Sequence, residues 1–142
     1  MTVPKHITKL LSMVKNSGSL ERIYLDSLKI HSIKNGKIDC TVTTPYYNNT
    51  GFQTFLIDSV TTFACFDKTG KTGVSVSLDI NRTDGCRKYG SKNIFNDSAE
   101  EREIRVYAEQ LNASGNVAMQ EAKIEDQKTG EVLCYGTHVK FL

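Results

Sequence analysis

The chain of 142 residues is long enough for one domain with its own hydrophobic core, and 39% of its residues are hydrophobic. The formal net charge is only +2, and no basic run alternates with aromatic residues, so the composition argues against a nucleic-acid-binding protein. No apolar run is long enough to cross a bilayer, and we expect a single domain over residues 1–142.

The N-terminal segment, MTVPKHITKLLSMVKN, predicts an amphipathic helix, because Ile7, Leu10, Leu11 and Val14 recur at helical spacing. The segment carries three lysines and no acid, so a mitochondrial targeting helix is one interpretation. A helix packed on the domain is the other, and the absence of arginine favours it. Cytoplasmic and mitochondrial locations both stay open.

A β-hairpin is expected next. The segment RIYLDSLKIHSIKNGKIDCTVTT predicts two strands joined at Asn35-Gly36, a dipeptide that favours a tight turn. Ile38, Cys40 and Val42 alternate and predict one face of the second strand.

A long central helix follows the hairpin. Thr50 is expected to be its N-cap, since Gln53 follows three residues later as in a capping box. One apolar face recurs at 3.6-residue spacing; it contains Phe52, Phe55, Leu56, Ser59, Val60, Phe63 and Phe66. The turn-forming residues 67–70 are expected to end the helix.

The second half of the chain predicts four strands. Val74, Val76, Leu78 and Ile80 alternate and indicate a strand with one buried face. The polar segment Thr83 to Arg102 is interpreted as an irregular loop. Three further strands are expected over Glu103–Leu111, Val117–Ile124 and Glu131–Phe141. Short turns between most strands predict an α+β fold, with an antiparallel sheet wrapped around one long helix.

The four cysteines, Cys40, Cys65, Cys86 and Cys134, are far apart and form no C-x-x-C pair. Together with three histidines they show no zinc-ligand spacing. We expect reduced thiols, no metal site and no cofactor.

Asp58 is the only charged residue between Cys40 and Phe66. Its helix face carries hydroxyls and a thiol, from Thr54, Thr61, Thr62 and Cys65. A helix face that is polar but almost uncharged predicts partial burial against a cleft or a partner subunit. There Asp58 can act as general base or nucleophile; the alternative is an ordinary polar residue of an amphipathic helix.

Two further features are candidates for the functional site: the start of the central helix and Ser75. The helix start, Asn48-Asn49-Thr50-Gly51, offers backbone N–H groups to a carbonyl or oxyanion, although ordinary capping explains it equally. Ser75 lies in the alternating strand. The chain contains no G-x-S-x-G elbow and no glycine-rich phosphate loop after a strand, which argues against a serine-hydrolase triad and against nucleotide binding.

Three segments in this order and spacing, FLIDSVTTFA, GVSVSLDIN and KTGEVLCYGTHVKFL, resemble the hotdog-fold acyl-CoA thioesterases of the PaaI type. The resemblance covers nearly the whole chain. It implies a central helix wrapped by the sheet, a homodimer that often doubles into a dimer of dimers, and hydrolysis of an acyl-CoA in lipid metabolism.

The resemblance also implies roles for individual residues. Asp58 matches the helix acid that serves as nucleophile or general base, and Ser75 matches a serine that positions the attacking water from the other subunit. Gly51 matches the glycine whose N–H polarises the thioester carbonyl. Either Asn48 or Asn49 matches a loop asparagine, with Asn49 preferred as the catalytic one. Asn48, Thr50, Thr54 and Ser77 are expected to bind substrate.

The chain departs from this family at the helix start, where an ungapped match places Asn49 and Thr50 over the usual His-Gly-Gly signature. The turn that carries a lysine for the CoA phosphates instead reads NASGN. The sequence therefore predicts an acyl-CoA thioesterase, and a catalytically weakened module that binds an acyl ligand or a protein partner is the alternative.

Overall fold

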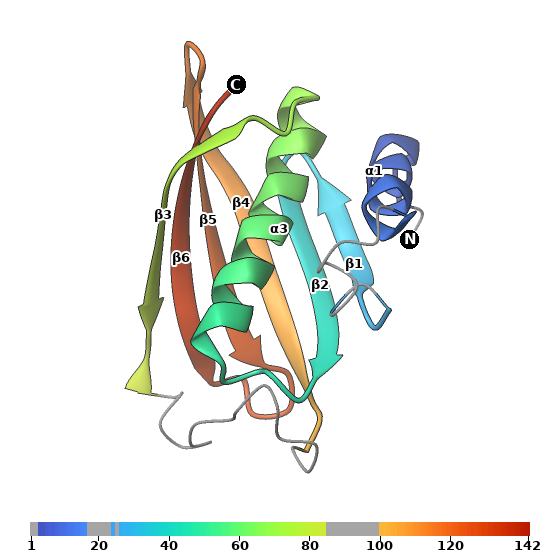
Figure 1. The fold of residues 1–142 in the computed structure, drawn as a ribbon, viewed down its shortest axis with the longest axis vertical. Helices are drawn as coiled ribbons and strands as arrows, with labels where there is room; N and C mark the ends of the chain where they lie inside the picture. Colours follow the sequence, from blue (N-terminus) through green and yellow to red (C-terminus); the bar gives the residue numbers. More distant parts are fainter. Residues whose placement is uncertain (1–2, 17–23, 25, 85–99) are drawn as a thin grey trace.

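The computed structural model describes residues 3–16, 24, 26–84 and 100–142. Within these ranges the order of elements is α1 (Lys5–Asn16), β1 (Lys29–Lys34), β2 (Lys37–Thr44), α3 (Thr50–Thr69), β3 (Val74–Arg82), β4 (Arg102–Ser114), β5 (Val117–Asp126) and β6 (Val132–Phe141). Figure 1 shows α3 lying across one face of a twisted sheet. The predicted α+β architecture is confirmed.

The sheet has six antiparallel strands in the order β1-β2-β4-β5-β6-β3. Strand β3 leaves the end of α3 and pairs with β6, the last strand of the chain. The edges of the sheet are therefore β1 and β3, and Figure 1 shows β3 at the edge beyond β6.

The β1-β2 hairpin turns at Asn35 and Gly36, as predicted. Both residues have positive φ, 52° and 76°, which is the requirement of the tight turn that matches the twist of the flanking strands. Strand β2 then buries Ile38, Cys40 and Val42 on one face, so the predicted alternation is confirmed.

The N-cap of α3 is Asn49, and the expectation for Thr50 was wrong by one position. The Asn49 side chain accepts a hydrogen bond from the Phe52 N–H at 2.8 Å, and its backbone is extended. Asparagine is at least as good an N-cap as threonine. At the other end Gly70 adopts φ 75° and donates its N–H to the Phe66 carbonyl, a glycine C-cap that ends the helix where expected.

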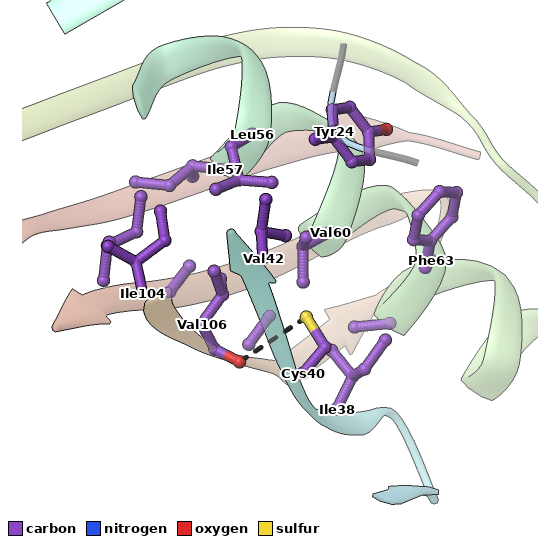
Figure 2. Close-up of a cluster of buried hydrophobic side chains, with 14 of the residues drawn as sticks. Tyr24, Ile38, Cys40, Val42, Leu56, Ile57, Val60, Phe63, Ile104 and Val106 are labelled. Carbon is purple, nitrogen blue, oxygen red and sulfur yellow. Dashed lines mark hydrogen bonds between the residues drawn. The ribbon is translucent and has the colours of Figure 1, made fainter. Parts of the chain in front are cut away.

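The core lies between α3 and the sheet. Figure 2 shows Leu56, Ile57, Val60 and Phe63 of α3 above side chains of β2 and β4. The strand residues of this layer include Ile38, Cys40, Val42, Ile104 and Val106. Burial of such side chains supplies the main free energy of folding.

Helix α1 packs on the domain through Ile7, which is fully buried. His6 Nε2 lies 3.0 Å from Asp67 Oδ1 near the end of α3. The His6 ring also contacts the Phe66 ring, with the two ring planes tilted by 47°. The interpretation of the N-terminal helix as part of the domain is confirmed by these contacts.

Strand β3 differs from its predicted pattern. Val74 and Val76 are 69% and 65% exposed, because a bulge between Ser75 and Ser77 inserts one residue into the strand. Val74 pairs with Phe141 on the sheet face away from α3, whereas Leu78 pairs with His138 on the α3 side. The predicted single buried face is therefore split between the two faces.

Most of the loop expected between Thr83 and Arg102, including Cys86, lies outside the described residues. The side chains of Cys40, Cys65 and Cys134 are buried. Among the described helices none is both long and apolar enough to span a bilayer.

Candidate active site

A cluster of polar side chains lies where α3, β3 and β6 meet. Helix α3 contributes Asp58, Thr61 and Thr62, the bulged start of β3 contributes Ser75, and β6 contributes His138 and Lys140. The β6 residues reach the helix because Cys134, Gly136, His138 and Lys140 alternate on the buried face of that strand. Gly136 allows the close approach, since a Cβ there would lie 2.7 Å from Ile57 Cγ2.

His138 is at the centre of the cluster and is 0% exposed. Its Nδ1 lies 2.8 Å from Thr61 Oγ1, and its Nε2 lies 2.7 Å from Ser75 Oγ. Both ring nitrogens are thus hydrogen-bonded, one to the helix and one to the edge strand.

Asp58 lies at the mouth of the cluster, with 46% of its side chain exposed. Its Oδ1 is 3.7 Å from His138 Nε2, which is beyond hydrogen-bond distance. Thr61 and Cys65 on the same helix side are buried. This agrees with the expectation of a helix face that is only partly exposed.

Lys140 is 4% exposed and donates from Nζ to Thr62 Oγ1 at 3.1 Å. Burial lowers the pKa of Lys140, while Asp58 and Cys65 act in the opposite direction. Burial also lowers the pKa of His138, as does the neighbouring Lys140, and Asp58 opposes them. A buried imidazole that resists protonation therefore lies beside an accessible carboxylate.

The residues at the helix start are engaged in local structure. Asn49 caps the helix. Arg82 at the end of β3 donates to both the backbone carbonyl and the side-chain oxygen of Asn48, at 2.7 and 2.8 Å. Thr54 donates its hydroxyl to the Thr50 carbonyl. Gly51, the second residue of the helix, has no intrahelical acceptor for its N–H.

The structure brings Ser75 to Asp58 within a single chain, through His138. This placement follows from the pairing of β3 with β6. The approach of Ser75 to the acid of the other subunit stays a prediction. Ser77 is not brought to the cluster, because the bulge places it opposite Val139, on the sheet face away from α3.

Sequence reasoning missed His138, Lys140 and Arg82. A signal for two of them exists in YGTHVKF, where His138 and Lys140 occupy alternate positions of a strand. Their place on the buried face depends on the register with β5 and β3, which the strand itself does not specify.

No group of three His, Cys, Asp or Glu side chains suited to a metal occurs among the described residues. A groove of about 560 Å³ lies on the other sheet face, beside Lys37, Tyr107, Lys123 and Tyr135. It contains none of the predicted site residues. We therefore place the candidate site at the Asp58 cluster.

No protein-family model and no curated protein matches this sequence. Solved structures do match. Zebrafish thioesterase superfamily member 2 aligns at 20% identity over 96% of this chain and 95% of its own, with a TM-score of 0.74. A hypothetical thioesterase from Streptococcus pneumoniae, determined with coenzyme A, aligns at 13% identity over 94% of both chains, with a TM-score of 0.70.

Phenylacetic acid degradation protein PaaI from Thermus thermophilus aligns at 16% identity over 86% of this chain and 96% of its own, with a TM-score of 0.60. At such identities the likeness establishes the fold. The chain therefore has the hotdog fold of these thioesterase-superfamily structures, as the resemblance implied.

Proposed function

We propose that this protein hydrolyses an acyl-CoA thioester to a free acid and CoA. The observation that carries the proposal is the placement of a partly exposed carboxylate, Asp58, next to Ser75 and the buried His138. The similarity to a thioesterase structure that holds coenzyme A supports the substrate class.

Asp58 is assigned the central role in one of two forms. As a general base, it accepts a proton from water while the water oxygen attacks the thioester carbon. As a nucleophile, it forms a mixed anhydride and expels the CoA thiolate, and water then hydrolyses the anhydride. In both forms the C–S bond breaks and Ser75 orients the water.

We assign the stabilisation of the oxyanion to the backbone N–H of Gly51, which would donate a hydrogen bond to it. Gly51 and Asp58 are seven residues apart on the helix, which corresponds to about 10 Å along its axis. One thioester carbon cannot be next to both groups of one chain. We therefore propose a homodimer in which the carbonyl is held by one subunit and attacked from the other, with pairing of dimers as a further step.

A second candidate is a weakened module that binds an acyl ligand or a protein partner. Asn49 takes the position of the family histidine and uses its side chain as a cap, while Asn48 is held by Arg82. Neither asparagine side chain is directed to a carbonyl by these contacts, which favours reduced turnover.

Release of free CoA from short-, medium- and long-chain acyl-CoAs tests the proposal. We expect the wild type to release CoA from at least one chain-length class, and Asp58→Asn to be slower by roughly 100-fold or more. Equal inactivity of both proteins across the panel would reject hydrolysis and favour the binding module.

A further inference from the structure

The hydrogen bonds around His138 determine where its proton lies. The Thr61 hydroxyl has one proton, and its Oγ1 lies 2.6 Å from the Ile57 carbonyl oxygen, which can only accept. Thr61 therefore donates to Ile57 and accepts from His138 Nδ1, 2.8 Å away. In the neutral ring the proton is then on Nδ1, and Nε2 is an acceptor.

This tautomer determines the direction of the Ser75 hydroxyl. Ser75 Oγ lies 2.7 Å from Nε2, and an unprotonated Nε2 can only accept, so Ser75 donates its proton inward. The oxygen lone pairs of Ser75 are left on the side of the solvent-accessible site. An oriented acceptor of this kind holds one hydrogen of a water molecule.

Protonation of His138 would reverse this arrangement. Nε2–H would then donate to Ser75 Oγ, and the Ser75 proton would turn outward, toward the region of the Asp58 carboxylate. The charged groups that act on the ring are Asp58 of α3, whose Oδ1 lies 3.7 Å from Nε2, and Lys140 of its own strand. Burial and Lys140 lower the pKa of His138 below its ordinary range against the opposing effect of Asp58, so the ring is neutral at pH 7.

We propose that His138 is a positioning residue that fixes Ser75 as a hydrogen-bond acceptor for the attacking water, with Thr61 holding the histidine in the required tautomer. The inference rests on the proposed hydrolysis and adds a group acting through Ser75. It holds for either role of Asp58, because both need an oriented water. No proton leaves His138 during the reaction.

The first test is the tautomer itself, measured by ¹⁵N NMR on the full-length wild-type protein. The sequence has only three histidines, so His6→Gln and His31→Gln assign the signals. We expect a protonated Nδ1 and an unprotonated Nε2 at pH 7, with protonation of the ring only below the ordinary histidine range. A protonated Nε2 at pH 7 would overturn the inference.

The second test uses the pH dependence of kcat/KM for CoA release. Because the neutral ring is the competent form, activity should be lost as pH falls through the histidine midpoint measured by NMR. His138→Gln, which does not titrate, should lack this inflection and lower kcat/KM by about tenfold at pH 7. If His138→Gln kept both the wild-type kcat/KM at pH 7 and the acidic inflection, the inference would be overturned.

Thr61 supplies the matched pair of variants. Thr61→Val removes the acceptor for Nδ1 and should lower kcat more than it raises KM, whereas Thr61→Ser keeps the acceptor and should restore kcat. Equal kcat for the two variants would count against the inference. A wild type that releases no CoA would instead reject the proposed function, while the NMR result would still decide the tautomer.

Discussion

Gly136 determines how closely α3 approaches β6. A methyl group there would lie 2.7 Å from Ile57 Cγ2 and 3.0 Å from Ile80 Cδ1, distances that force neighbouring side chains to shift. We expect Gly136→Ala to destabilise the protein by about 1–3 kcal/mol through overpacking. The urea midpoint, at an unchanged slope, measures this loss.

Thr137→Ala is the control for Gly136→Ala, because it changes the adjacent residue, which faces the groove on the other side of the sheet. This variant should stay within about 0.5 kcal/mol of the wild type. Equal stability of Gly136→Ala and the wild type would show that Ile57 can move away and that the helix is less tightly held.

At the scale of elements, Asp67 joins three of them. Its Oδ1 contacts His6 of α1 at 3.0 Å, and its Oδ2 accepts from the Gly36 N–H of the β1-β2 turn at 2.9 Å. The carboxylate is 7% exposed. We expect Asp67→Ala to cost about 1–3 kcal/mol and to speed hydrogen exchange at the Gly36 amide.

Two controls separate the contacts of Asp67. His6→Ala removes only the link to α1 and should leave the Gly36 amide protected. Asp79→Ala removes an exposed carboxylate from β3 and should be nearly neutral. An unchanged exchange rate at Gly36 in Asp67→Ala would contradict the bridging role.

The elements were largely predictable because each has a local signal. The hairpin has Asn35-Gly36, and α3 has a periodic apolar face ended by Gly70. The N-cap was misplaced by one residue because Asn49 and Thr50 are both good caps. The bulge at β3 has no such signal: the valine alternation continues through it, so the opposite directions of Ser75 and Ser77 appeared only in the structure.

The site was predictable only in part for a related reason. Asp58 is conspicuous in the sequence as the one charge in an uncharged stretch. His138 belongs to the last strand, and its contact with Ser75 joins residues 63 positions apart. Such a contact follows from sheet register, which depends on the pairing of several strands.

At the scale of the whole molecule, the edge strand β3 exposes Val74 and Val76 beside Phe141, which is 50% exposed. An apolar edge with unpaired backbone groups is suited to pairing with a second chain. We expect the wild type to sediment as a dimer or larger assembly, and Val74→Lys/Val76→Lys to sediment as a monomer with lower CoA release.

Met13→Lys is the control for edge pairing, because Met13 is also strongly exposed but lies on α1. This variant should keep the assembly and the activity. A double variant that remains dimeric would place the interface elsewhere, and a fully active monomer would contradict the assignment of Gly51 and Asp58 to different subunits.

The catalytic role of Asp58 is tested most directly by kcat/KM for CoA release, measured for Asp58→Asn, Asp79→Asn and the wild type. Each variant replaces one solvent-accessible aspartate by asparagine, which has nearly the same volume and no charge. Only Asp58 lies at the His138 cluster. We expect a loss of roughly 100-fold or more for Asp58→Asn and wild-type activity for Asp79→Asn. Equal activity of the two variants would contradict a catalytic site at Asp58.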